Sequence, residues 1–190
     1  MKTQQIIKPS LLFAETRLSG PEVRTSRKTL AGLAAVFLDK EAYAAFPADT
    51  PVYEVSSFIP AGLSLPGALN FGITKLFPGK IGREYFMTQG HFHARIDCGE
   101  YYWGLEGEGV LLLMDRQRNT WGERMFPGSL HYIPGGTAHR VANTGDIPLS
   151  FAACWPSDAG HDYEEIALHG FSARLMEING TPQLTASCIV

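Results

Sequence analysis

The chain alternates short apolar runs with turns rich in glycine, a pattern typical of β-strands. Apolar and polar positions alternate along Gly72–Phe77 until Pro78 and Gly79 mark a turn. Comparable runs, bounded by glycine or by charged turns, predict further strands at 51–58, 84–88, 100–103, 109–114, 120–125, 129–133, 139–143 and 149–155. Such a series of short strands predicts an all-β fold, either a closed antiparallel sandwich or a jelly roll.

Only two segments carry helix signals. Asp39 is a candidate N-cap for a helix at 40–46, and Asp162 is one for a helix at 163–169. No internal repeat or interdomain linker interrupts the 190 residues, so we expect one domain. We expect this domain to have three parts, namely an N-terminal extension at 1–50, a barrel core at about 51–160 and a C-terminal tail at about 161–190.

Composition and charge exclude several classes of partner. The net charge of −3 and the pI near 6.1 give no basic patch for a nucleic acid. No window approaches the roughly 18 uninterrupted apolar residues of a membrane span, and no signal peptide is apparent. Three scattered cysteines suit a reducing compartment better than a disulfide framework, so we expect a soluble, cytoplasmic protein: Cys98, Cys154 and Cys188.

Three histidines and one glutamate have the spacing of a metal site. His91 and His93 are two residues apart, so in a strand both face inward while Phe92 packs on the other face. A turn at Asp97–Gly99 then brings Glu100 beside them, and His139 enters from another strand after the turn at 134–136. The alternative is that the histidines only satisfy hydrogen bonds in the core.

As metal ligands, these four side chains leave coordination positions open. Three imidazole nitrogens and one carboxylate suit a divalent ion such as Fe(II), Mn(II), Ni(II) or Zn(II). Tyr102 lies two residues after Glu100 and shares its face, so it is expected to line the same cavity.

The motifs around these residues resemble those of a known superfamily. Gly90-His91-Phe-His93-x6-Glu100-x6-Gly107 resembles the first cupin motif, and Gly128-x5-Pro134-x-Gly136-x2-His139-x3-Asn143 resembles the second. The segments 77–93 and 155–163, together with 51–55 and 170–172, resemble the cupin-type glucose-6-phosphate isomerases of archaea and some bacteria. The similarity extends from about Thr29 to about Asn179. It implies a cupin barrel that interconverts glucose 6-phosphate and fructose 6-phosphate. It also implies a homodimer with one divalent metal ion per subunit, for which Fe(II) is the first choice.

The resemblance also assigns roles to residues. It implies metal ligation by His91, His93, Glu100 and His139. It implies substrate contacts, chiefly near the phosphate, by Tyr53, Thr74, Thr88 and Gly90. Tyr102 and His161 fall where family side chains approach the sugar. Two departures affect the sugar pocket: Trp155 stands where the family usually has tyrosine, and Gly136 stands where an aromatic residue is expected.

Aldose–ketose isomerisation moves hydrogen between C2 and C1 and develops negative charge on the carbonyl oxygen. Glu100 is the candidate proton carrier through a cis-enediol, although coordination to a cation lowers its basicity. A metal-assisted hydride shift is the alternative. His161 is a candidate for assisting ring opening, and Tyr102 for ordering the substrate hydroxyls.

Several alternatives remain open at this level. Four basic residues either add charge for a phosphate or are solvated surface positions: Lys75, Lys80, Arg83 and Arg95. The apolar segment Leu30–Phe37 covers either a partner subunit or the protein's own barrel. A non-haem metal dioxygenase and a non-catalytic sugar-binding cupin are the competing functions.

Overall fold

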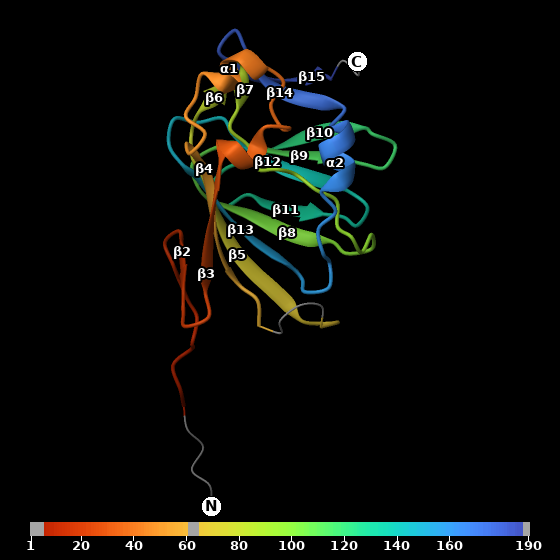
Figure 1. Cartoon of the computed structure of the whole chain (residues 1–190). Helices are drawn as coiled ribbons and strands as arrows, with labels where there is room; N and C mark the ends of the chain where they lie inside the picture. The colour runs from red at the N-terminus through yellow and green to blue at the C-terminus, as the bar shows by residue number, and fades with distance from the viewer. Residues whose placement is uncertain (1–5, 61–64, 188–190) are drawn as a thin grey trace, which may run out of the picture.

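Two antiparallel sheets face each other in the structure, a computed structural model that describes residues 6–60 and 65–187 (Figure 1). Leu76 and Phe151 of the larger sheet and Leu111 and Leu113 of the smaller one belong to the same buried core. The all-β jelly-roll prediction is therefore confirmed. The larger sheet has the order β11-β8-β13-β5-β4-β3, with bounds Leu130–Ile133, Glu100–Glu106, Leu149–Pro156, Leu69–Leu76, Pro51–Phe58 and Arg24–Thr29. The smaller has the order β10-β9-β12, with bounds Thr120–Met125, Gly109–Met114 and Ala138–Asn143.

A four-stranded sheet at one end of the barrel includes a C-terminal hairpin that the sequence pattern did not indicate. The hairpin joins the rest of the sheet through the pairing of Met176 with Glu84. At the other end of the molecule a second hairpin, β1–β2 (Leu12–Ala14 and Arg17–Ser19), lies beside β3 (Figure 1). The four-stranded sheet has the order β15-β14-β7-β6, with bounds Thr181–Ala186, Ala173–Ile178, Glu84–Tyr85 and Lys80–Ile81.

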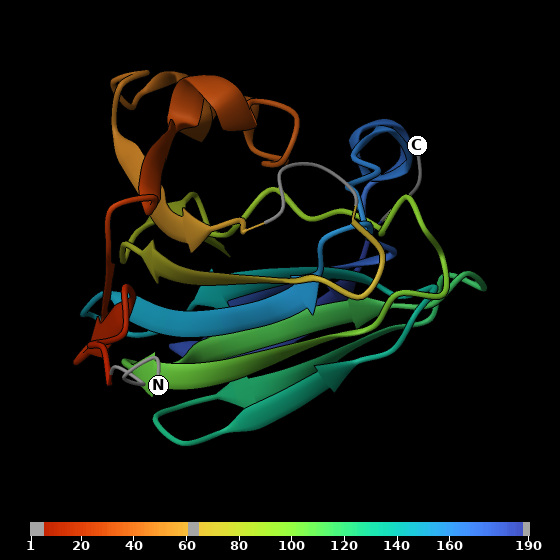
Figure 2. The same cartoon turned by 90° about the horizontal axis from the view of Figure 1, so that it is seen from below.

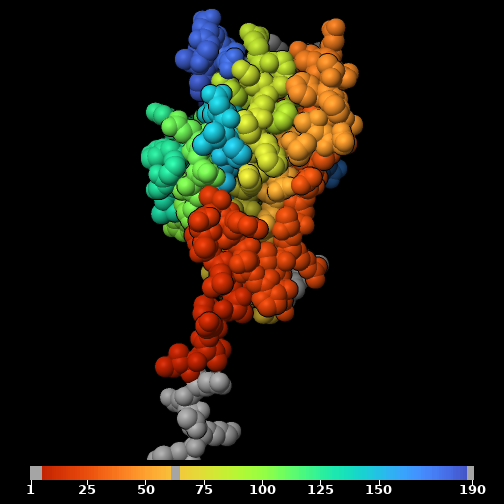
Figure 3. Space-filling model, turned by 90° about the vertical axis from the view of Figure 1, so that its left-hand side faces the viewer, coloured from red at the N-terminus to blue at the C-terminus, as the bar shows by residue number. Residues whose placement is uncertain are grey.

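The N-terminal segment is built into the barrel. β3 pairs with β4 along its length, and the 3₁₀ helix η1 (Leu30–Leu33) follows it directly. Leu30 and Phe37 are each 1% exposed and belong to the main core, so this apolar segment covers the protein's own barrel. Leu18 of the β1–β2 hairpin packs against the outer face of the larger sheet, where it forms a second, smaller core. The hairpin, coloured red, lies at one end of the molecule beside this sheet (Figures 2 and 3).

The helix signals place the helices correctly but miss their ends. Asp39 caps α1 (Lys40–Ala44) as expected, since its Oδ1 accepts the Ala42 N–H at 2.9 Å. The second helix, α2 (Glu164–His169), has Tyr163 as its N-cap, and Asp162 instead accepts the Glu164 N–H at 3.1 Å. No helix among the described residues is long and apolar enough to cross a membrane.

The strand expected at 84–88 is interrupted, and this matters for the site. Regular pairing ends at Tyr85, and the backbone of the segment that follows is bridged to β12 at two isolated positions, Met87 and His91. Gly90 between them has a φ of +77°, a left-handed conformation that glycine adopts without strain. Because the pairing is irregular, the strict alternation of faces in a strand does not apply along this segment.

Candidate functional site

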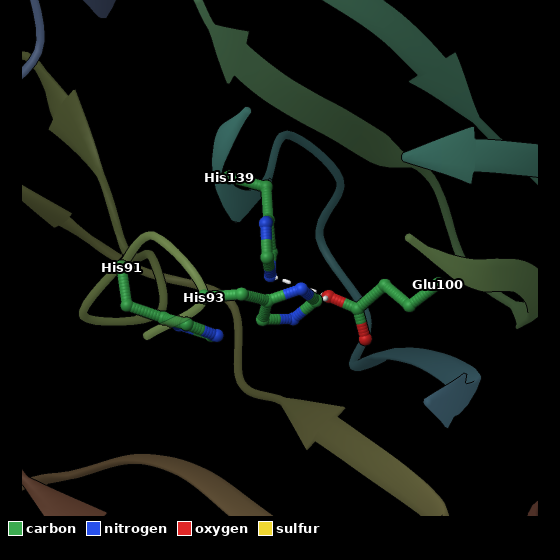
Figure 4. A group of neighbouring side chains, drawn as sticks. All are labelled: His91, His93, Glu100 and His139. Atoms are coloured by element: carbon green, nitrogen blue, oxygen red, sulfur yellow. Dashed lines mark ion pairs between the residues drawn. The ribbon is translucent and has the colours of Figure 1, made fainter. Parts of the chain in front are cut away.

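The four predicted ligand residues converge on one point inside the barrel (Figure 4). Their ligand atoms all lie within 4.8 Å of one another. Glu100 is the first residue of β8 in the larger sheet, while His139 lies on β12 of the smaller sheet. His91 and His93 come from the segment between β7 and β8, and His91 is held against His139 by two backbone hydrogen bonds of 3.3 and 3.1 Å.

Hydrogen bonds orient two of the imidazole rings towards that point. His93 Nδ1 lies 2.7 Å from the Cys98 carbonyl oxygen, and His139 Nδ1 lies 3.2 Å from that of Thr137. A carbonyl accepts only from a protonated nitrogen, so both rings carry the proton on Nδ1 and leave the Nε2 lone pair free, as in metal-ligating histidines.

The inward-facing atoms are buried and lack hydrogen-bond partners. Nε2 of His91, His93 and His139 and Oε1 of Glu100 make no hydrogen bond among the described residues. Glu100 Oε1 lies 2.6 Å from His139 Nε2 and 3.3 Å from His93 Nε2, so the lone pairs crowd together. Buried polar atoms are rarely left unpaired, and a divalent cation would satisfy all four at once. The donor set therefore fits a metal ion.

The electrostatics of the cluster favour an ionised Glu100 and a neutral His91. Burial opposes ionisation of Glu100, but the charges and hydrogen bonds of His139 and His93 outweigh it and hold the pKa of its carboxyl at about 2. Burial, followed by the neighbouring imidazoles, lowers the pKa of His91 well below its usual range. Burial also lowers the pKa of His161, so that ring is neutral near pH 7.

A pocket of about 630 Å³ opens beside the cluster, within the size range of small-molecule sites. His91, Glu100 and His139 form part of its wall, whereas His93 lies behind them. The structure brings all of the predicted substrate contacts into this same pocket: Tyr53, Thr74, Thr88, Gly90, Tyr102, Trp155 and His161.

Hydroxyl groups along the wall are available as hydrogen-bond donors. Thr88 Oγ1 accepts the Val141 N–H at 3.1 Å, which leaves its own O–H free to donate. Burial raises the pKa of Tyr53 to about 12, and burial together with the Glu100 charge raises that of Tyr102 well above its usual range. Both phenols therefore keep their protons at neutral pH.

Comparison with known proteins agrees with this geometry. The family model described as glucose-6-phosphate isomerase matches residues 27–186. The chain belongs to the glucose-6-phosphate isomerase family.

Relatives in this family come from archaea and bacteria. The glucose-6-phosphate isomerases of Thermococcus litoralis and Pyrococcus furiosus are 42% and 41% identical over 159 residues, which cover 83% of this chain and 83% of each relative. The putative glucose-6-phosphate isomerase 2 of Rhizobium meliloti is 38% identical over 157 residues, covering 81% of this chain and 78% of the relative. Among solved structures, oxalate decarboxylase from Bacillus subtilis superposes with a TM-score of 0.46 at 18% identity, over 58% of this chain and 26% of that one.

The four basic residues considered for charge at the isomerase pocket do not line it. Lys80 pairs with Glu177 at 2.6 Å and Arg95 pairs with Asp158, both on the surface. Lys75 and Arg83 are also absent from the described pocket wall, so the interpretation as solvated positions holds for all four. Two other basic residues, Arg27 and Lys28 of β3, reach the wall. No pattern pointed to them, because β3 was not recognised as a strand.

The two departures from the family pattern have different consequences. Trp155 lines the pocket and lies over Gly72, where an added Cβ would stand 3.2 Å from the indole Cη2. Gly72 thus leaves room for the larger ring. Gly136 lies in a turn with a φ of +73° and does not line the described pocket.

Two further pocket residues escaped the sequence analysis. Tyr163 stacks on His161 with ring centroids 5.6 Å apart and planes inclined by 7°, and both rings approach His91. Gln89 lines the wall between Thr88 and Gly90. The only signal in the sequence for Tyr163 and Gln89 was that each lies close to residues of the predicted site.

Proposed function

We propose that this protein is a metal-dependent isomerase that interconverts glucose 6-phosphate and fructose 6-phosphate. One observation carries the proposal: four buried, unpaired ligand atoms lie within 4.8 Å of one another, and three of their residues line a pocket that also holds the hydroxyl donors. Family membership and the names of the relatives supply the reaction and the substrate.

His91, His93, Glu100 and His139 hold the metal in this proposal, with Fe(II) as the first choice and Mn(II), Ni(II) or Zn(II) as the alternatives. A divalent ion bound there supplies a positive charge for the oxygen that becomes negative during isomerisation. The phenol of Tyr102 donates to the sugar hydroxyls. The neutral ring of His161 accepts a proton from the ring hydroxyl as the sugar opens.

We assign proton transfer between C2 and C1 to Glu100. Its low pKa makes it a weak base, so the transfer depends on the acidity that the neighbouring positive charge gives the substrate C–H. Turnover in deuterated water is expected to introduce deuterium at the carbon that gains hydrogen. Product free of deuterium, once transfer of a trapped proton that never exchanged with solvent has been excluded, would show that hydride moves directly and that Glu100 is only a ligand.

The other end of the pocket binds the phosphate in this proposal. The hydroxyls of Tyr53, Thr74 and Thr88 and the Gly90 N–H form a donor cluster, and a phosphate oxygen accepts from such donors. Trp155 forms the wall beside the sugar. Arg27 and Lys28 contribute positive charge near this pocket, although Arg27 is already paired with Glu54 at 2.6 Å.

We further propose a cytoplasmic homodimer. Cys98 and Cys154 are both free thiols, as expected in a reducing compartment. The outer face of β8 and β11 carries three exposed large side chains, Tyr101, Leu130 and Tyr132, and a second copy of this chain would cover them.

The proposed activity is tested by isomerisation of fructose 6-phosphate before and after chelation. Turnover is expected to disappear on chelation and to return when Fe(II) or another divalent ion is added. His91→Gln should lose both the metal and the activity. His131→Gln, which changes a buried histidine bonded to Glu123 outside the cluster, should keep the metal. No turnover across a panel of hexose and pentose phosphates would contradict the proposal. Substrate-dependent oxygen consumption would instead favour a dioxygenase, and ligand binding without turnover a non-catalytic cupin.

A further inference from the structure

The Gln89–Gly90 turn separates the large pocket from a second, smaller cavity. Both residues line the large pocket, and both also line a cavity of about 50 Å³ on the other side of the turn. The guanidinium of Arg140, which is 6% exposed, lies in this second cavity and does not reach the large pocket.

Arg140 holds the Gln89–Gly90 turn from the side of the small cavity. Its Nη2 donates to the Gln89 carbonyl oxygen at 2.9 Å, its Nη1 lies 3.2 Å from Met87 Sδ, and its guanidinium carbon lies 4.4 Å from the centre of the Phe171 ring. A Cβ added to Gly90 would stand 2.8 Å from Arg140 Nε and 3.1 Å from Phe171 Cε2. Gly90 is therefore required by its φ of +77° and by the arginine packed against it.

The positive charge of Arg140 has no carboxylate partner within 4.0 Å among the described residues. The nearby Glu84 is already engaged, because it accepts from Arg174 at 2.5 Å and from the Leu38 N–H at 2.6 Å. Arg140 Nε is buried without a hydrogen-bond partner in the same part of the chain. An unpaired buried cation is costly in free energy, so an anion that comes close to it is favoured.

The N–H of Gly90, a residue that lines both cavities, also makes no hydrogen bond to a described residue. We propose that Arg140 is a positioning residue for the anionic end of the substrate. It holds the Gln89–Gly90 turn so that the free N–H is available to a phosphate, and its uncompensated charge makes the turn attractive to a dianion. This inference rests on the proposed function, since it assigns the phosphate of that substrate to the turn.

The test uses inorganic phosphate as a competitive inhibitor of fructose 6-phosphate isomerisation by the metal-loaded protein. Arg140→Gln is expected to raise the inhibition constant for phosphate and the KM for the sugar phosphate by roughly tenfold to a hundredfold, as for loss of a charged hydrogen-bonding group. The kcat and the bound metal should change far less. Arg140→Lys keeps the charge without the planar fork, so we expect it to recover part of the loss.

Arg174→Gln is the matched control, because Arg174 lines the same small cavity but is paired with Glu84 and does not contact the turn. It should leave the phosphate inhibition constant unchanged. An unchanged constant in folded Arg140→Gln, or an equal increase in Arg174→Gln, would overturn the inference. If Arg140→Gln does not fold, Arg140→Lys is compared with wild type, and an unchanged constant there overturns it as well. A wild-type protein that neither isomerises sugar phosphates nor binds phosphate would refute the proposed function instead.

Discussion

The histidines of the candidate metal centre respond to pH in opposite directions. Burial and the neighbouring imidazoles lower the pKa of His91, whereas the Glu100 carboxylate, 3.3 Å from His93 Nε2, outweighs burial and raises the pKa of His93. Below the usual value of 6.5, unfolded His91 takes up a proton that the folded side chain refuses, so protons favour the unfolded state through this residue. His93 has the opposite effect, because its folded form binds the proton more tightly.

His91→Gln isolates the first of these effects in metal-free protein. As the pH falls from about 6.5 to about 5, the melting temperature of this variant should fall less than that of wild type. The loss of stability that comes from protonation of the Glu100 carboxylate occurs at lower pH, between 4.5 and about 2. Thermal melts of both proteins in chelator across this range provide the measurement. If the melting temperatures of wild type and His91→Gln fall in parallel above pH 5, the loss of stability in that range does not come from His91.

At the scale of single residues, the metal cluster was predictable and its cationic surroundings were not. His91, His93 and Glu100 are close in sequence, and the two histidines converge as predicted although their segment forms isolated bridges and no regular strand. Lys28 reaches the site through strand pairing, and Arg140 reaches it through the core. Neither contact produces a recognisable pattern in the local sequence. Tertiary packing is what brings these charges to the pocket.

At the scale of elements, alternation predicted most strands of the two facing sheets and missed β3 and the C-terminal hairpin. The predicted bounds of β4, β9 and β10 are confirmed at 51–58, 109–114 and 120–125. β3 and β15 are exposed along most of their lengths, so neither carries an apolar alternation. Both are held by pairing with a neighbour, which a single sequence does not reveal.

The segment after η1 offers a direct test of how the N-terminal region stabilises the barrel. Phe37 is 1% exposed and packs near Tyr43 and Phe86, with ring centroids 6.2 and 6.3 Å away. Phe37→Ala should lower the free energy of unfolding by about 3–5 kcal/mol without removing the metal. Leu38→Ala is the control, because Leu38 is 60% exposed and its replacement should cost less than about 0.5 kcal/mol. Denaturant titrations measure the free energy of unfolding of each variant. Equal losses in Phe37→Ala and Leu38→Ala would show that the segment is not part of the core.

At the scale of the whole molecule, the outer face of the larger sheet is only partly covered. The β1–β2 hairpin packs over Ile73 and Ala152, but Tyr101 and Tyr132 further along the sheet remain 48% and 56% exposed, with ring centroids 5.2 Å apart. Aromatic residues in an exposed apolar patch are typical of protein interfaces. This face is where we expect the two subunits of the proposed dimer to meet.

Sedimentation of wild type and Tyr132→Lys tests this arrangement. The substitution places a charge in the centre of the proposed interface, so the fraction of dimer should fall markedly at a fixed concentration. Trp121→Lys on β10 serves as the control, because Trp121 is 37% exposed and lies on the smaller sheet. Dissociation by Trp121→Lys alone would place the interface there, and a monomeric wild type would rule out the dimer.

The distribution of the candidate ligands over both sheets also ties metal uptake to the order of folding. Glu100 belongs to the six-stranded sheet and His139 to the three-stranded one, while His91 and His93 lie on the segment bridged to β12. No pair of neighbouring strands assembles the centre alone, and pairings between segments distant in sequence form slowly. If the proposed metal binds there, a refolding chain acquires its metal affinity only when the two sheets come together, so the rate of metal uptake is expected to report barrel closure.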